Sequence, residues 1–276
     1  MTPGTATAQQ LVQLSWTDLA VVSLCLLVNV ALSFHYGLAM HRSLVVAGLR
    51  TVVQLTFVGY VLQRVFAVDE PLLVLGILAL MVLMAGTTVA NRSSHRFPGR
   101  WLVAVGSISF PAFLMVGYGV LFVIRPDNWA DPRYLIPLMG MVLGNSLTAV
   151  HLTMDRYTQA VFSQRRAIEH LLCLGATPQE ATLPHARDAV RSGMTPILNA
   201  MVIAGIVSLP GMMTGQILGG TPPLMAVRYQ IVIMFLLAGT TALGSALCVL
   251  WLRHRLFDAR ERITPGLVSR DTRRGG

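Results

Sequence analysis

The chain has 276 residues, of which 54% are hydrophobic and 12% are charged, and its formal net charge is +9. A soluble domain carries roughly twice this share of charged residues, so the composition excludes an ordinary soluble protein. Nucleic-acid binding is a poor explanation of the positive charge, because the arginines follow a membrane orientation.

Seven apolar segments predict an all-α integral membrane protein with about seven transmembrane helices, since each is close to the roughly 20 residues that cross a bilayer. The segments are 16–36, 44–64, 71–90, 101–124, 134–154, 194–217 and 227–252. Spans one to five thus occupy residues 16–154, and spans six and seven occupy 194–252. The fifth segment is more polar than the others, and a Pro/Gly break near 210–223 interrupts the sixth, so six or eight spans also fit.

The arginines predict the orientation. The chain contains no lysine, and all 21 basic residues are arginine. With the tail 1–15 outside, the cytoplasmic segments hold sixteen arginines and the outer segments hold four, which is a strong positive-inside bias. We therefore expect a multi-pass protein of the cell (inner or plasma) membrane, with an extracytoplasmic N-terminus and a basic cytoplasmic tail at 253–276. The four outer arginines are Arg64, Arg125, Arg133 and Arg228.

Polar residues inside the predicted spans are candidates for a translocation path, because ionisable groups are costly in a bilayer and are often functional. Arg50 and Gln54 lie four residues apart and therefore share a helix face. Arg50 also fits a second interpretation, in which its side chain reaches the cytoplasmic headgroups. Asn145 lies in the fifth span, together with His151, which fits an interhelical hydrogen bond better than a metal ligand.

Residues 155–193 form a large cytoplasmic insertion between the fifth and sixth spans. Gly175 is suited to end a first helix. The sequence Thr177-Pro178-Gln179-Glu180 then has the pattern of a capping box that starts a second helix, with Thr177 at the N-cap and Glu180 at N3. Two interpretations remain open: a folded linker between two spans, or a rigid helical hairpin that docks on a partner.

The break in the sixth span begins at Pro210 and Gly211. A broken membrane helix is tolerated where its backbone faces protein or a watery cavity, so we place this break and Gln216 on the translocation path. Met212 and Met213 fit flexible packing at a gate, and also a soft-metal site, since thioethers suit Cu(I) better than hard ions. No cluster of Asp, Glu, His or Cys has metal-ligand spacing. The metal ligands are therefore unknown, with His151, Met212 and Met213 as candidates.

Four stretches of the chain resemble one family of transporters: LRTVVQLTFVGYVLQ (49–63), IPLMGMVLGNSLTAVHL (136–152), LGATPQEA (174–181) and IVSLPGMMTGQILGGTPPLMAVRYQIVIMF (206–235). On these stretches the chain resembles the FetB/YbbM-type ABC transporter permeases, a family of iron exporters with plant aluminium-sensitivity membrane proteins as relatives. The resemblance implies a permease subunit, not an enzyme, that forms a homodimer in the lipid bilayer and exports iron or another metal. It also implies a separate cytoplasmic ATPase that holds the ATP and Mg²⁺, with no cofactor on this chain.

The resemblance makes the hairpin the coupling element that docks on the ATPase. Glu169 and Gly175 are partly similar to the E-A-A…G signature of ABC importer permeases, although His170 and Leu171 stand where that signature has two alanines. The expected coupling residues are Glu169, Leu171, Leu174, Gly175, Ala176, Thr177, Pro178 and Glu180.

The absence of lysine supports a separate ATPase, because a Walker A loop needs a lysine against the phosphates. An ion-coupled secondary transporter is an alternative, favoured by the broken helix and opposed by the scarcity of carboxylates inside the spans. An ABC permease for an amphiphilic organic substrate and a non-transporting membrane scaffold are further alternatives. The metal and the export direction rest on the resemblance.

Overall fold

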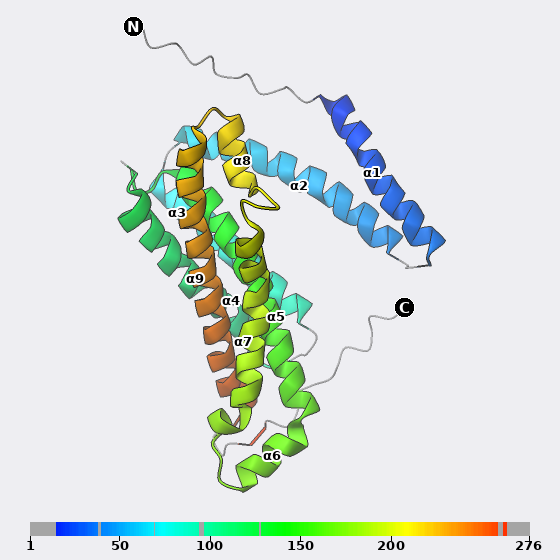
Figure 1. Cartoon of the computed structure of the whole chain (residues 1–276), viewed down its shortest axis with the longest axis vertical. Helices are drawn as coiled ribbons and strands as arrows, with labels where there is room; N and C mark the ends of the chain where they lie inside the picture. The colour runs from blue at the N-terminus through cyan, green and yellow to red at the C-terminus, as the bar shows by residue number, and fades with distance from the viewer. Residues whose placement is uncertain are drawn as a thin grey trace. The chain divides into compact units, whose positions relative to one another are not determined.

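The computed structural model describes residues 15–37, 40–68, 70–93, 97–126, 128–258 and 262–263. The regular elements in these ranges are helices (Figure 1), which confirms the all-α prediction. The chain divides into two compact units, one made of the residues up to Glu70 with 215–221, and the other of 71–214 with the residues from 222 onward. The predicted N-terminal tail and most of the basic C-terminal tail lie outside the described residues.

The first unit is built on a helical hairpin of α1 (Trp16–His35) and α2 (His41–Val68). A capping box starts α1, where the Ser15 hydroxyl accepts from the Asp18 N–H and the Asp18 carboxylate accepts from the Ser15 N–H. At the turn, the Ser33 hydroxyl accepts a 3.1 Å hydrogen bond from the backbone of Met40. Large apolar side chains are exposed along both helices, as expected of helices that face lipid or another membrane helix.

The second unit is a bundle of long helices with α5 at its centre. Its helices are α3 (Pro71–Arg92), α4 (Arg100–Tyr118), α5 (Pro132–Ser163), α7 (Pro178–Ile203) and α9 (Pro223–Leu256), and α4 continues into the π-helical segment η1 (Gly119–Ile124). α5 packs against α3, α4, α7 and α9. Its buried face includes Met139, Met154 and Tyr157, which are fully buried. The short helices α6 (Arg165–Cys173) and α8 (Gly211–Leu218) complete the order, and the division between the two units falls within α8.

Small residues let α7 approach α5 and α9 closely. A Cβ placed on Gly193 of α7 would lie 2.8 Å from the Ala149 carbonyl of α5 and 2.7 Å from the Ser245 hydroxyl of α9, and it would overlap the Thr153 hydroxyl. Small residues at such crossings are a common basis of helix association in membranes, because they allow backbones to come together. Because there is no side chain at Gly193, α7 packs directly against α5 and α9 at the centre of the bundle.

Six helices in the described ranges are long and apolar enough to cross a membrane, namely α1, α2, α3, α4 with η1, α5 and α9. This count is close to the seven spans that the sequence predicts. The predicted span that is missing from the six is 194–217. In the structure these residues form the last part of α7, an irregular segment at 204–210, and then α8. Gly205 has a φ of +82°, and the residue before Pro210 is disfavoured in a helix, so the helix cannot run through this segment.

The helices on either side of the predicted insertion 155–193 are longer than their predicted spans. α5 continues to Ser163, and its 32 residues make it about 48 Å long, against a hydrocarbon core of about 30 Å. α7 already begins at Pro178. The insertion is therefore mostly an extension of these two helices, and the hairpin proper is α6 with the turn that follows it (Figure 1).

Arginines of the second unit gather at the end of the bundle that carries α6, which we call the hairpin end. α4 begins at this end, since Gly99 lies against Arg255 near the end of α9. The opposite end carries Arg125, Arg133 and Arg228. The arginines at the hairpin end include Arg92, Arg100, Arg156, Arg165, Arg166, Arg187, Arg253 and Arg255.

Candidate functional site

The turn after α6 is closed by backbone hydrogen bonds. The N–H of Ala176 donates to the carbonyl of Leu171 at 3.1 Å, and the N–H of Gly175 donates to the carbonyl of Leu172 at 3.0 Å. This pair of bonds is a Schellman motif, which needs a left-handed residue at its centre. Gly175 supplies it with a φ of +93°, so the predicted helix stop is confirmed.

The predicted capping box at the start of α7 is also confirmed. The Thr177 hydroxyl accepts from the N–H of Glu180 at 3.3 Å, and the Glu180 carboxylate accepts from the N–H of Thr177 at 2.9 Å. Pro178 stands at the first helical position. The hydrogen bonds from the backbone and hydroxyl of Thr177 lower the pKa of Glu180 from its ordinary value, because they favour the ionised carboxylate.

The hairpin is anchored to the bundle through buried side chains of α5 and α7. The Tyr157 hydroxyl donates to the Thr182 hydroxyl at 3.0 Å, and that hydroxyl donates in turn to the carbonyl of Pro178 at 2.6 Å. Tyr157 and Thr182 are both buried, as is Ile168 on the inner side of α6. The start of α7 is therefore fixed to α5 by a short polar chain inside the protein.

The outer side of the hairpin is apolar and exposed. Leu174 is 73% exposed and Leu171 is 42% exposed, and Ala176 is half-buried beside them. Glu169 forms an i, i+4 ion pair with Arg165, with 2.7 Å between Oε1 and Nε. Two exposed leucines, one in the last turn of α6 and one at its C-cap, are suited to dock on a partner, because exposed apolar groups gathered on one element are typical of interaction sites.

A cavity beside the hairpin adds residues that sequence reasoning missed. It has a volume of about 540 Å³ and lies between the start of α7 and the end of α9. The sequence did offer one signal for this cavity. The predicted basic tail begins with a run of arginines, and Arg253, which lines the cavity, is the first of them. The cavity is lined by Thr177, Pro178, Gln179, Arg253, His254, Phe257 and Asp258.

The helix is interrupted at 204–210, between α7 and α8, whereas the sequence placed the break near 210–223, where residues 211–218 form α8 and the chain turns again at 219–220. α7 ends at Ile203, the chain turns at Gly205, and α8 begins at Gly211. The carbonyl of Pro210 accepts from the N–H of Thr214 at 3.0 Å, so Pro210 stands at the start of α8. Met212 and Met213 on its first turn are both half-buried. The predicted path residue Gln216 follows on α8, and its side-chain oxygen is buried with no hydrogen-bond donor among the described residues.

The other predicted path residues lie on two different helices. Arg50 and Gln54 are exposed on α2, in the first unit. Asn145 lies on α5, in the second unit, and its side-chain amide donates to the Met141 carbonyl of its own helix at 3.0 Å. That bond satisfies one amide donor locally.

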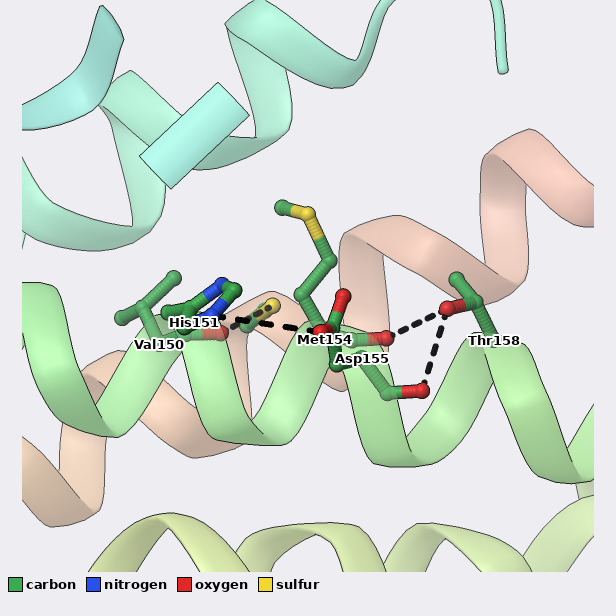
Figure 2. Close-up of polar contacts among 6 residues, drawn as sticks. Val150, His151, Met154, Asp155 and Thr158 are labelled. Carbon is green, nitrogen blue, oxygen red and sulfur yellow. Dashed lines mark hydrogen bonds and ion pairs between the residues drawn. The ribbon is translucent and has the colours of Figure 1, made fainter. Parts of the chain in front are cut away.

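His151 pairs within its own helix. Its Nε2 lies 3.9 Å from the Asp155 carboxylate one turn further along α5 (Figure 2). At 3.9 Å this is an i, i+4 contact and not a hydrogen bond, and the ring's Nδ1 is buried with no hydrogen-bond partner among the described residues, so the interhelical hydrogen bond stays a prediction. Within the described ranges, no three side chains of the His, Cys, Asp or Glu type come together as metal ligands.

Comparison with known proteins identifies the family. The signature of an uncharacterised protein family, UPF0014, matches residues 16–257. The chain belongs to the UPF0014 family. A UPF0014 membrane protein of Synechocystis is 38% identical over 257 residues, covering 92% of this chain and 98% of the relative.

Two further relatives of this UPF0014 chain carry functional names. The Escherichia coli protein named probable iron export permease protein FetB is 30% identical over 249 residues, covering 89% of this chain and 93% of the relative. The Arabidopsis thaliana protein named ALUMINUM SENSITIVE 3 is 32% identical over 229 residues, covering 82% and 81%. These names agree with the FetB-type resemblance found in the sequence. No solved structure matches the chain.

Proposed function

We propose that this UPF0014 protein is the membrane-spanning permease subunit of an ATP-driven ABC transporter, which exports iron or another metal and is powered by a separate ATPase. The observation that carries the proposal is the hairpin at 165–180. It combines a Schellman stop, a capping box, a buried anchor to α5 and an exposed apolar tip. A rigid element of this kind can pass the motion of a docked partner to α5 and α7.

The arginines and the absence of lysine support the same assignment. The hairpin lies at the arginine-rich end of the bundle, and positive residues favour the cytoplasmic side, where ATP is available. A chain without lysine has no Walker A loop. The nucleotide site therefore belongs to a partner, and the partner approaches the hairpin end.

The proposed cargo path runs along the break between α7 and α8. An interrupted helix exposes backbone carbonyl and N–H groups, which a membrane protein tolerates where they line a cavity or contact protein. Arg50, Gln54 and Gln216 add polar groups to otherwise apolar helices. The metal and its outward direction come from the name of the Escherichia coli relative, and a homodimer completes the proposed transporter.

The test is reconstitution with a candidate ATPase. The full chain is co-purified with ABC ATPases from the same genome, and ATP hydrolysis and metal movement are measured in liposomes. Leu171→Ser with Leu174→Ser should weaken association about fivefold or more, because the minority of interface residues at the centre of a contact are those whose truncation costs more than about 1 kcal/mol. Leu224→Ser is the matched control, since Leu224 is 78% exposed at the start of α9, at the opposite end of the bundle.

The cargo path is tested with Arg50→Ala and Gln54→Ala in the same liposomes. Both variants should lower metal movement while ATPase association stays unchanged. Normal transport by both would leave snorkelling and packing as the roles of these residues. An ion-coupled secondary transporter, which the broken helix favours, predicts metal movement that follows an ion gradient without ATPase. That result would replace the proposal.

A further inference from the structure

A second cavity lies on the side of the bundle, between the first half of α4 and the last turns of α9. It has a volume of about 500 Å³, which is within the range of roughly 300–1,000 Å³ for ligand sites. Both helices belong to the second unit. The cavity is lined by Leu102, Val103, Val105, Gly106, Trp251, His254 and Arg255.

The apolar part of this groove is shaped by a glycine and a tryptophan. The six-membered ring of Trp251 lies directly on Gly106, where a Cβ would overlap it. Val103 closes the groove toward the core and is buried, whereas Leu102 at its rim is 54% exposed. The result is an apolar trough on the outer surface of a membrane helix bundle, lined by side chains that an acyl chain could contact.

The other end of the groove is positively charged. The guanidinium of Arg255 lies against Gly99, with its Cζ 3.3 Å from the position that a Cβ would take there, so packing places this cation at the start of α4. His254 lines the same end, and none of the described lining residues is acidic. The first turn of a helix adds partial positive charge from its free N–H groups. This end of the groove therefore favours an anion.

The position of the groove fits a membrane interface. Tryptophan is enriched at the level of the lipid headgroups, and arginine at the cytoplasmic ends of spans. Basic pockets between membrane helices are known to hold anionic headgroups. Here an aromatic ring, an apolar trough and a guanidinium follow one another toward the arginine-rich end of the bundle.

We propose that this groove binds one anionic phospholipid, with an acyl chain against Leu102, Gly106 and Trp251 and the phosphate at Arg255 and His254. A free anion would use only the charged end, and a lipid without net charge would gain less from the Arg255 guanidinium. The lipid site does not depend on the ATPase or on the cargo, so its test is independent of the test of the proposed function.

The test is retention of lipid by the purified full chain. The protein is mixed with equal amounts of phosphatidylglycerol and phosphatidylcholine in detergent, washed stepwise, and examined by native mass spectrometry. The unaltered chain should retain phosphatidylglycerol preferentially. Arg255→Gln should lower that retention about tenfold, the expected loss for one hydrogen bond to a charged group. Leu102→Trp should fill the trough and lower the retention of both lipids.

Arg253→Gln is the matched control. Arg253 is two residues away on the same helix end, carries the same charge and lines the other cavity, so its loss should leave retention unchanged.

Equal retention by Arg255→Gln and the unaltered chain would overturn the site, as would equal retention of both lipids. Excess inorganic phosphate that displaces the lipid completely would assign the site to a free anion. Disulfide cross-linking of two Leu102→Cys chains would assign the groove to a second copy. The Arg255→Gln result decides the proposal even if Leu102→Trp fails to fold.

Discussion

The hairpin turn at 174–177 and the break at 204–210 both interrupt a helical path, and both contain a left-handed glycine, but they are built differently. Gly175 has a φ of +93° and Gly205 one of +82°. Around Gly175, backbone hydrogen bonds satisfy the last carbonyl groups of α6, and side-chain hydrogen bonds of the capping box satisfy N–H groups at the start of α7. Around Gly205, the connecting residues are apolar and exposed, with Ile206 86% and Val207 77% exposed.

This difference separates a rigid element from one that can rearrange. The cap and turn hydrogen bonds of the hairpin are made by its own residues, and the Tyr157–Thr182 hydrogen bond joins it to α5, so the hairpin and α5 can move together with these bonds intact. The break has backbone bonds from Gly205 to Ser208 and from Val207 to Ile203, but its apolar side chains are not held inside the chain. We therefore expect the hairpin to transmit motion and the break to respond to it, with α7 as the helix that joins them.

The largest expected effect comes from the packing of α7 itself. Gly193→Val should prevent α7 from seating on α5 and α9, because its side chain would meet the Ala149 carbonyl and the hydroxyls of Thr153 and Ser245. Overpacking of this kind costs about 1–3 kcal/mol, and a fixed carbonyl places the cost at the upper end. Thermal unfolding in detergent should show a Tm several degrees lower.

Gly144→Ala is the control for this experiment. Gly144 lies on α5, and a Cβ there would meet nothing within 4 Å. Its Tm should stay close to that of the unaltered chain. An unchanged Tm for Gly193→Val would mean that α7 does not need its close contact, and the rigid connection between the hairpin and the break would be lost as an explanation.

The second prediction compares the two glycines directly. Gly175→Val and Gly205→Val carry a similar backbone cost, about 1–2 kcal/mol for a left-handed residue with a side chain, and a Cβ at either position meets nothing within 4 Å. Gly175→Val should lower ATPase association and stimulation by the proposed partner. Gly205→Val should leave that association intact and change metal movement alone. The same loss in both variants would show that the two regions do not have separate roles.

Sequence alone predicted the local structure of the hairpin, because its signals are short-range. Gly175, Thr177 and Glu180 act within a few residues of one another, so their pattern determines the cap. The continuation of α5 to Ser163 and the cavity beside Arg253 depend on contacts between helices distant in sequence, and these leave no local pattern. The break was predicted at Pro210 and Gly211, where the new helix starts, because proline marks a boundary more plainly than Gly205 does.

The third prediction removes the cap and leaves the turn in place. Thr177→Ala with Glu180→Ala should destabilise the start of α7, since loss of an N-cap costs about 0.5–2 kcal/mol. Hydrogen exchange of the amides in the first turn of α7 should become faster, and ATPase stimulation should fall less than in Gly175→Val. Thr195→Ala is the control, because Thr195 is exposed on the same helix and its hydroxyl donates to the carbonyl of Arg191 at 2.8 Å. Equal exchange rates in the two variants would contradict the role of the capping box.

The smallest expected effect is a dependence on pH confined to the hairpin. The pKa of Glu180 is lowered by the hydrogen bonds from Thr177, so the ionised carboxylate stabilises the folded hairpin above the ordinary glutamate pKa of about 4.3. That stabilisation is lost as the pH falls through the lower folded pKa. The opening equilibrium measured by hydrogen exchange at Thr177, corrected for the intrinsic rate at each pH, should therefore shift toward the open state in acid.

Glu180→Gln should remove most of this shift, because its side chain does not ionise, while the amides around Gly205 should show no such dependence in either protein. A shift of equal size at both regions would indicate general acid unfolding and would remove the capping box as its cause.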